Sequence, residues 1–380
     1  MRVLLIKLSS LGDVVHLLPA LTDARAALPG VQFDWVVERG FVAIPAWHPA
    51  VDRVIPIALR QWRKAPFQWA HGGRVWGELR AFHAALRTRS YDLVIDAQGL
   101  IKSTIVASLA RGERAGFDQA SAREPLASIG YRHRYAVVRN AHAIDRLRNL
   151  LAQALGYTQP PGTADYGLVC PPRPIAAGRP YIVLLHGTTW RNKRWPIAQW
   201  RELVQQALAA GFAVLVPCVG ADERGDAETI AEGLPGSEIL ADQSLSDIGA
   251  WLAHADGVVG VDTGLAHLAA ALGTPTITLH GPTDARRTGV SALHGTAMSA
   301  TLSCAPCAQR VCALDGSVSL RPDSIVGACG VTPCMTQFQA PAVWLTLRIQ
   351  MQTKAQVQIN EQPNTQVRMS PMPCTVELRA

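Results

Sequence analysis

Two motifs that usually mark nucleotide sites are missing from this sequence. The chain opens with the apolar run RVLLI, a turn with Ser and Gly, and a helical pattern, but the turn holds neither GxGxxG nor GxxxxGK[ST]. The first absence counts against a dinucleotide-dependent oxidoreductase, which is the alternative enzyme class. Instead, the turn delivers a carboxylate, Asp13, to the start of the helix, where a bound phosphate would be expected.

Long apolar runs and a secretion signal are also missing. A long charge-free stretch, residues 263–283, contains Pro275 and Pro282 and predicts a helix, a turn and a strand instead of a membrane span. The first apolar run is too short for the apolar region of a signal peptide. Eight Cys without such a signal favour reduced thiols. We therefore expect a soluble, cytosolic protein.

Positive charge is concentrated in the first half of the chain. Residues 1–155 carry 21 Lys and Arg against 12 Asp and Glu, a net charge of +9, so that the remainder carries −2. This asymmetry predicts an anionic partner for the first half: nucleic acid, an acidic membrane surface or an acidic substrate. A solvated surface rich in Arg is the plain alternative. The sequence contains no recognisable nucleic-acid module, so we expect no nucleic-acid partner.

Strand-like and helical patterns alternate along the chain, which predicts an α/β fold with parallel sheets covered by helices. A Pro-rich stretch, residues 159–180, separates two units of similar size. We expect an N-terminal Rossmann-like domain over residues 1–158, a C-terminal one over 181–347, and a cleft between them. The Gln-rich residues 348–380 show no sustained helical or strand face and predict a disordered tail.

The expected elements can be given by residue range. In the first half they are strands 3–8, 33–37, 51–57 and 93–96 and helices 13–27, 77–86, 103–110 and 144–155. In the second half they are strands 181–185, 213–217, 257–261 and 276–279, with helices starting at residues 195, 223, 245 and 265.

One candidate anion site follows the first strand of the second unit. The segment LLHGTTWRNKRWP offers Thr188, Thr189 and Lys193 just before a helix start. Hydroxyl groups and a cation beside free backbone N–H groups favour a bound anion. The plain alternative is Thr capping with a solvated Lys.

A second candidate follows a later strand of the same unit. Asp262, Thr263 and Gly264 form the turn, and His267 falls on the first turn of the next helix. Glycine lets the backbone approach a ligand closely. A lone His would be structural, but beside two other candidate anion-binding groups it indicates a diphosphate contact.

Five separated segments, in this order, resemble a known family. They are KLSSLGDVVHLLPALTDA, DAQGLIKS, AREPLAS, HGTTWRNKRWP and VDTGLAHLAAALGTPTITLHGPTD. Together they resemble the lipopolysaccharide heptosyltransferases over residues 1 to about 347. The turn SSLGD and the segment AREPLAS favour the members that add the first heptose to Kdo on lipid A, with members that add a later heptose as the alternative. The resemblance implies the GT-B fold, with the acceptor on the N-terminal domain and the nucleotide sugar on the C-terminal one.

The resemblance also implies roles for single residues. Asp13 becomes the general base of an inverting transfer, and Lys193 stabilises the ADP leaving group. The donor, ADP-L-glycero-D-manno-heptose, is then bound by a set of residues from the second unit. They are Thr188, Thr189, Lys193, Glu223 at the ribose, Gln243 beside the adenine, Asp262, Thr263, Gly264 and His267. The plain alternative for Asp13 is an ordinary helix cap. No cofactor and no metal are implied.

The acceptor, Kdo-lipid A, is anionic, and the resemblance places it against cationic and polar residues of the basic half. The candidates are Ser10, Arg60, Arg63, Lys64, Gln98, Lys102 and Arg123. Basic and aromatic side chains interleave over residues 53–89, which predicts attraction to an anionic membrane surface. We therefore expect a peripheral protein on the cytoplasmic face of the inner membrane.

Five cysteines cluster between residues 304 and 334. Their spacing, CxxC followed by further Cys, is typical of a metal site when taken alone. The resemblance supplies no metal role, so we expect thiols in a compact loop. They are Cys304, Cys307, Cys312, Cys329 and Cys334.

Overall fold

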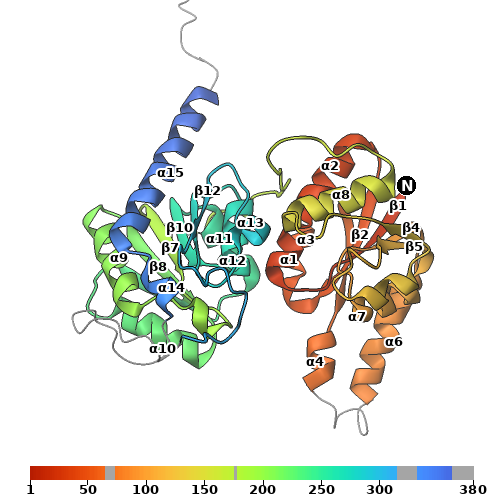
Figure 1. Cartoon of the computed structure of the whole chain (residues 1–380), viewed down its shortest axis with the longest axis horizontal. Coiled ribbons are helices and arrows are strands. Elements are labelled where there is room, and N and C mark those ends of the chain that lie inside the picture. Colours follow the sequence, from red (N-terminus) through yellow and green to blue (C-terminus); the bar gives the residue numbers. More distant parts are fainter. Residues whose placement is uncertain (65–72, 175–177, 315–331, 362–380) are drawn as a thin grey trace, which may run out of the picture.

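The chain contains two parallel six-stranded sheets, each covered by helices (Figure 1). The computed structural model describes residues 1–64, 73–174, 178–314 and 332–361. The predicted α/β class, with two Rossmann-like units, is confirmed. The first sheet has the order β3-β2-β1-β4-β5-β6 and the second the order β12-β11-β10-β7-β8-β9.

The first sheet lies between two helical layers because its strands are apolar on both faces. Val3 and Leu5 of β1 face the layer that contains α2 and α8, while Leu4 and Ile6 face the layer that contains α6 and α7. Its strands are β1 (Arg2–Ile6), β2 (Gln32–Glu38), β3 (Val51–Ile57), β4 (Ser90–Asp96), β5 (Arg111–Phe117) and β6 (His133–Tyr135). Its helices are α1 (Leu11–Val15), α2 (Leu18–Ala27), α3 (Ala43–Ala46), α4 (Leu59–Lys64), α6 (Gly73–Arg87), α7 (Ile101–Leu109) and α8 (Ala143–Leu155), with the 3-10 turns η1 (Arg39–Phe41) and η2 (Pro125–Gly130).

The second sheet repeats this plan. Val183 and Leu185 of β7 face one layer, and Ile182 and Leu184 face the other, which includes α9 and α15. Its strands are β7 (Tyr181–Leu185), β8 (Ala213–Cys218), β9 (Ser237–Ala241), β10 (Gly257–Val261), β11 (Thr276–His280) and β12 (Gly295–Ser299). Its helices are η3 (Arg191–Lys193), α9 (Ile197–Ala209), α10 (Gly220–Ala231), α11 (Leu245–Ala253), α12 (Gly264–Ala271), α13 (Ala285–Thr288), α14 (Pro333–Thr336) and α15 (Ala340–Glu361).

Two predictions about helices need correction. The helix expected over residues 13–27 is split into α1 and α2, with Pro19 in the first turn of α2, where a proline starts a helix well. The tail expected to be disordered from residue 348 is helical as far as Glu361, because it continues α15. Val343 and Leu347 anchor α15 in the core of the second domain. Residues 362–380 lie outside the described part.

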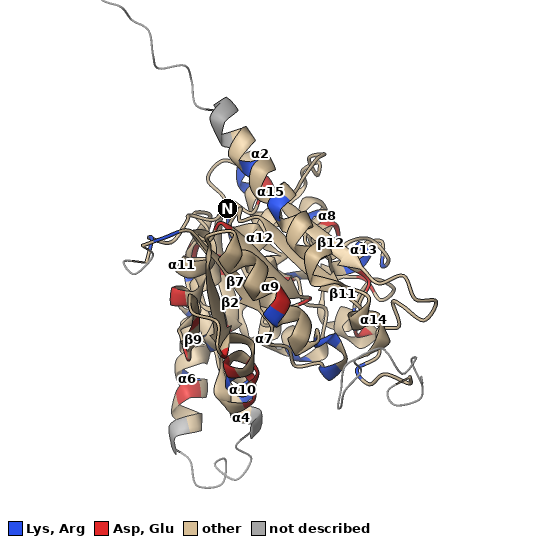
Figure 2. Cartoon of the chain, turned by 90° about the vertical axis from the view of Figure 1, so that its left-hand side faces the viewer, with Lys and Arg blue, Asp and Glu red and all other residues tan. Residues whose placement is uncertain are grey.

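Few charges lie along α15 (Figure 2). Its sequence therefore lacks the charged face by which an amphipathic helix is recognised. Sequence periodicity also missed four strands. β5 and β6 are the last two strands on one side of the first sheet, and β9 and β12 are the two edge strands of the second sheet. β5 and β9 carry charged or polar residues and lack the continuous apolar run of a central strand.

The strand order reverses next to β1 in the first sheet and next to β7 in the second. Crevices form at such reversals beyond the carboxyl ends of the strands, where ligands bind in open α/β sheets. Helices α1 and α12 start at these two crevices and pack against each other. A Cβ atom on Gly264 would lie 2.6 Å from Leu11 Cβ and 2.9 Å from the Gly12 nitrogen, so only glycine permits this close contact between the two domains.

Candidate functional site

A cavity of about 830 Å³ between the two domains brings most of the predicted site residues together. The first domain contributes Ser10, Asp13, Arg60, Gln98, Lys102 and Arg123, and the second contributes Thr188, Thr189, Lys193, Glu223, Asp262, Thr263 and Gly264. Gln243 and His267 are not among the lining residues. Arg63 and Lys64 belong to α4, and their side chains lie outside the described part.

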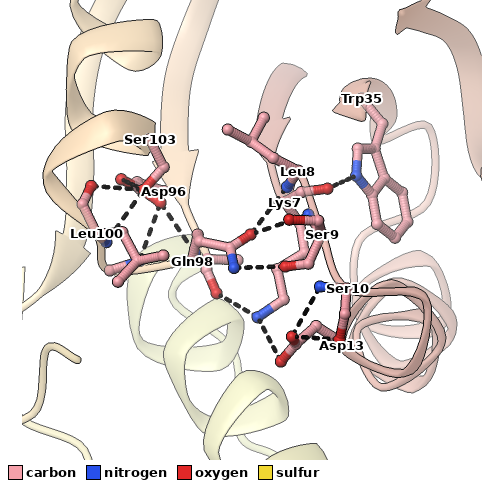
Figure 3. Close-up of polar contacts among 12 residues, drawn as sticks. Lys7, Leu8, Ser9, Ser10, Asp13, Trp35, Asp96, Gln98, Leu100 and Ser103 are labelled. Atoms are coloured by element: carbon pink, nitrogen blue, oxygen red, sulfur yellow. Dashed lines mark hydrogen bonds and ion pairs between the residues drawn. The ribbon is translucent and has the colours of Figure 1, made fainter. Parts of the chain in front are cut away.

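Asp13 occupies the third position of α1 and accepts hydrogen bonds from the residue before the helix (Figure 3). The backbone N–H of Ser10 lies 2.8 Å and its hydroxyl 2.9 Å from the same oxygen, Oδ2. The ammonium of Lys7 is 3.8 Å from Oδ1. Burial by itself would raise the pKa of Asp13, but the Lys7 charge and the Ser10 N–H outweigh it and hold that pKa below its usual value. Asp13 is therefore ionised at neutral pH.

Gln98 fixes the turn that carries Asp13 (Figure 3). Its Oε1 accepts from the backbone N–H groups of Leu8 (2.9 Å) and Ser9 (3.3 Å), and its Nε2 donates to the Ser9 carbonyl (2.5 Å). The Gln98 backbone N–H in turn donates to the fully buried Asp96. The Gln98 side chain lines the cavity, but its amide is occupied by the backbone of the turn. Its position supports the shape of the site.

Lys193 is held in the second domain by a carboxylate. Its ammonium donates to Oδ2 of Asp262 over 2.8 Å and to the Asp262 carbonyl over 3.1 Å, and it lies 4.7 Å from the centre of the Trp190 ring. Asp262 Oδ1 is 3.2 Å from His267 Nε2. Burial opposes ionisation of Asp262, but His267, His280 and Lys193 together hold its pKa far below the usual value. Asp262 thus positions the cation and the imidazole.

His267 lies at the boundary between the two domains. Its ring centroid is 4.6 Å from that of His16, at the end of α1, and the rings meet edge to face. Burial and the neighbouring His267 lower the pKa of His16 well below its usual value. The His16–His267 contact therefore joins the domains through imidazole rings, of which His16 is neutral. The predicted diphosphate contact of His267 stays a prediction.

Glu223 lies in the first turn of α10 and lines the larger cavity. Its Oε2 accepts from the Val219 N–H over 3.0 Å, and its backbone carbonyl is 3.0 Å from His186 Nε2. A Cβ atom on Gly187 would lie 2.6 Å from the Glu223 carboxylate, so this glycine makes room for it. The sequence analysis overlooked Gly187, although a glycine two residues after a strand is a signal for a close backbone approach. Gln243 lies after β9, where its amide donates to the Ala241 carbonyl over 3.3 Å.

A second cavity, of about 500 Å³, adjoins Asp13 and is lined by arginines that the sequence did not reveal as a group. Arg139 and Arg146 come from the first domain and Arg287 from the second. Burial, followed by the charges of Arg287 and Arg139, lowers the pKa of Arg146. Asp284, another lining residue, is already paired with Arg286 at 3.0 Å. Lys7, Gln98 and Arg123 also line this cavity, which therefore favours an anion.

Two further observations concern metals and membranes. Among the described residues, no three His, Cys, Asp or Glu side chains are arranged to hold a metal ion. Cys304, Cys307, Cys312 and Cys334 line one small cavity, and Cys329 lies outside the described part. In the described ranges, every helix is too short or too polar to cross a bilayer.

Comparisons with known proteins agree with the predicted resemblance. Residues 79–317 match the model of glycosyltransferase family 9 (heptosyltransferase). Lipopolysaccharide heptosyltransferase 1 of Pseudomonas aeruginosa is 50% identical over 314 residues, which are 82% of this chain and 87% of that protein. The structure of the Escherichia coli heptosyltransferase WaaC with ADP superimposes with a TM-score of 0.78 and 40% identity, over 92% of this chain and 100% of the other.

A second structure of the same Escherichia coli protein contains ADP-2-deoxy-2-fluoro heptose. It superimposes with a TM-score of 0.71 and 44% identity over 79% of this chain and 94% of the other. These similarities extend over both sheets, so the predicted arrangement of two facing Rossmann-like domains is confirmed.

Proposed function

The chain belongs to glycosyltransferase family 9, the heptosyltransferases, and from this premise we propose that it moves L-glycero-D-manno-heptose from ADP-heptose to Kdo of Kdo-lipid A. The product would carry the first heptose of the lipopolysaccharide inner core. One observation carries this proposal. Asp13 of the first domain and Lys193 of the second line the same cavity, with a carboxylate on one side and a cation on the other. An inverting transfer needs this division between a base and a stabilised leaving group.

The proposed reaction begins at Asp13. Ser10 occupies Oδ2 twice, so Oδ1 is the oxygen that would remove the proton of the attacking Kdo hydroxyl. The Kdo oxygen then bonds to the anomeric carbon, the bond from that carbon to the diphosphate oxygen breaks, and the electron pair leaves with ADP. Lys7 would keep Asp13 ionised until the acceptor hydroxyl is in place.

Lys193 would act on the leaving group. The loop after β7 and the start of α12 line the cavity with Thr188, Thr189 and the backbone around Thr263. N–H groups, hydroxyl groups and a cation of this kind bear the charge that develops on the diphosphate. Asp262 would hold Lys193 and His267 in place, and Glu223 would accept hydrogen bonds from the ribose hydroxyls. Gln243 is proposed to lie beside the adenine.

The acceptor would lie on the first domain. We assign its anionic groups to Arg60, Lys102 and Arg123 in the larger cavity and to Arg139, Arg146 and Arg287 in the adjoining one. Ser10, Arg63 and Lys64 remain candidates from the sequence. Since Asp13 lines both cavities, a Kdo hydroxyl could reach it while a carboxylate of the same acceptor contacts the arginines.

We further propose that the protein acts as a peripheral protein on the cytoplasmic face of the inner membrane, where a lipid A acceptor lies. The net charge of +9 on residues 1–155 supports attraction to anionic lipids. Exposed charges lose their reach when the Debye length falls to about 3 Å at 1 M salt, so this attraction should be salt-sensitive.

A transfer assay tests the proposal. Purified protein, ADP-heptose and a Kdo-lipid A acceptor should yield an acceptor heavier by one heptose. An acceptor that already carries one heptose should stay unmodified, whereas its modification would indicate a member that adds a later heptose. ADP-heptose should also raise the melting temperature. Protection by NADH without protection by ADP-heptose would contradict the proposal in favour of an oxidoreductase.

A further inference from the structure

Four large aliphatic side chains are exposed on two neighbouring segments of the first domain. On α7, Ile101 is 43% and Ile105 58% exposed, and on η2, Leu126 is 64% and Ile129 69% exposed. Residues four apart in a helix lie on the same face, so the two isoleucines share one side of α7. We call these four residues the α7–η2 patch. Single exposed apolar residues are ordinary, but several on adjacent segments indicate a surface for interaction.

The two segments of the α7–η2 patch are joined firmly. Thr104 of α7 donates to the Ala127 carbonyl over 3.2 Å and lies 2.8 Å from the Tyr131 hydroxyl. The backbone N–H of Ile101 donates to the Glu124 carboxylate over 2.7 Å. Beside Thr104, Gly130 has no side chain, which leaves room for the threonine methyl group. The exposed aliphatic side chains are therefore displayed by a folded surface whose two segments are fixed to each other.

The α7–η2 patch borders the acceptor side of the larger cavity. Leu100 and Lys102, which flank Ile101, line that cavity, as do Arg123 and Glu124, which precede η2. Of these four lining residues, Lys102 and Arg123 carry positive charges and Glu124 a negative one, which leaves a net charge of +1 beside the patch. Helix α6 packs beside α7, and the two lie on the lower side of the first domain in Figure 1.

We propose that the α7–η2 patch inserts into the headgroup region of an anionic bilayer and so presents the cavity to a lipid-linked acceptor. The proposal rests on the proposed function, because only a lipid acceptor requires the cavity to face a membrane. Aliphatic side chains enter the interface by the hydrophobic effect, while nearby Lys and Arg are attracted to anionic headgroups. Charge complementarity therefore selects the bilayer as the occupant. This surface differs from residues 53–89, which the sequence alone indicated.

A triple substitution, Ile105→Ser, Leu126→Ser and Ile129→Ser, tests the inference. All three side chains are exposed, so the fold should persist, with an unchanged circular dichroism spectrum and melting temperature. Binding is measured by sedimentation with sucrose-loaded vesicles of phosphatidylglycerol and phosphatidylcholine. We expect the partition coefficient of the triple variant to be at least about fivefold lower than that of the unmodified protein. The matched control replaces Leu293, Leu345 and Ile349, which are similarly exposed on the second domain, by Ser and should bind like the unmodified protein. If the triple variant does not fold, Leu126→Ser alone serves.

Two acceptors separate this inference from the proposed function. With the acceptor embedded in vesicles, the triple variant should show a severalfold higher apparent KM. With a deacylated, water-soluble acceptor, its transfer rate should equal that of the unmodified protein. The inference would be overturned if the triple variant sedimented with vesicles as strongly as the unmodified protein, or as strongly as the control variant. A dimer of the unmodified protein that the substitutions turn into a monomer would also overturn it and assign the patch to self-association. If the unmodified protein transferred heptose to neither acceptor, the proposed function would be refuted instead. The sedimentation experiment does not depend on transfer, so it would still test the membrane contact.

Discussion

Lys193 and Asp262 form an ion pair of 2.8 Å that joins the loop after β7 to the loop after β10. Both side chains are largely buried, with exposed fractions of 12% and 9%. The cation proposed to face the diphosphate is thus held by a carboxylate of its own domain, and His267 holds the other oxygen of that carboxylate. A buried pair of this kind is costly to break from one side, because the remaining charge lacks compensation.

Replacing Lys193 by Ala should weaken ADP-heptose binding and slow the transfer. Its charge would act on the phosphates in the ground state and on the more anionic leaving group in the transition state. We expect a loss of about 10²–10³-fold in kcat, measured in steady-state assays, together with a higher donor Kd by calorimetry. Arg194→Ala is the matched control, because Arg194 is its neighbour but pairs with Asp226 at 3.5 Å. Unchanged donor affinity together with an unchanged rate in the Lys193 variant would show that Lys193 does not act on the donor.

Replacing Asp262 by Asn should destabilise the protein in a pH-dependent way. At pH 7 the variant leaves Lys193 without its counter-charge, and we expect a loss of about 3 kcal/mol in the free energy of unfolding, measured with urea. The pKa of Asp262 is lowered in the folded state, so its contribution to stability is complete above its unfolded value of 3.8 and declines as the pH falls below that value. The difference between the two proteins should therefore shrink below about pH 4.

The exposed Asp222→Asn on α10 serves as the control for this pH series and should follow the unmodified protein throughout. A stability difference between the Asp262 variant and the unmodified protein that grows as the pH falls from 5 to 3 would contradict the assignment.

The second domain's motifs could be found from the sequence because each is local. Thr188, Thr189 and Lys193 share one loop, and Asp262, Thr263 and Gly264 share one turn, so a strand followed by a helix start was enough to indicate them. The central strands were equally clear, since burial on both faces demands a continuous apolar run. β5 and β9 lack such a run and were missed, as were the short β6 and β12, whereas the edge strand β3 was predicted.

Other features depend on tertiary structure and had no local signal. Arg139, Arg146 and Arg287 are brought together only by the contact between the domains, so none stood out among the other arginines. Gly264 indicated that the backbone comes close to a ligand. In the structure its backbone also lies close to Leu11 and Gly12 of α1 in the other domain. The helical residues 348–361 continue α15, whose first part packs on α9. The Gln-rich segment taken alone does not contain those anchoring residues, so it could not indicate a helix.

Replacing Asp13 by Asn should separate helix capping from catalysis. The amide oxygen of Asn can still accept the Ser10 N–H, so the fold should be retained, while the base is lost. We expect kcat to fall by about 10²–10⁴-fold with the donor Kd nearly unchanged, because the base acts on the acceptor. Asp145→Asn, in the first turn of α8, is the control and should remain active. Turnover of the Asp13 variant within a few-fold of the unmodified protein would exclude the general base.

The pKa of Asp13, held below its usual 3.8, adds a condition to that experiment. Asp13 should be fully ionised between pH 6 and 8, so its titration should not produce a falling limb in the kcat profile of the unmodified protein over this range. A limb that is present in the unmodified protein and absent from the Asp13 variant would show that the pKa of the carboxyl group is higher in the complex with substrates.

Replacing Arg287 by Ala should raise the KM for the acceptor and leave donor binding unchanged. Arg287 belongs to the second domain, but it lines the adjoining cavity with Arg139 and Arg146 of the first. An acceptor carboxylate bound there would lose one charge-assisted hydrogen bond, which corresponds to about 10-fold or more in apparent affinity. Arg132→Ala is the control, because that side chain is 73% exposed, pairs with Glu113 and is not among the lining residues of either cavity.

Calorimetry with a soluble Kdo acceptor makes this last prediction independent of turnover. The Arg287 variant should bind it more weakly than the Arg132 variant, while both bind ADP-heptose alike. The difference should diminish at high salt, since partly exposed charges are screened as the Debye length shortens. Equal acceptor affinity in the two variants would show that the arginine cavity is a solvated surface and would leave the acceptor to Arg60, Lys102 and Arg123 alone.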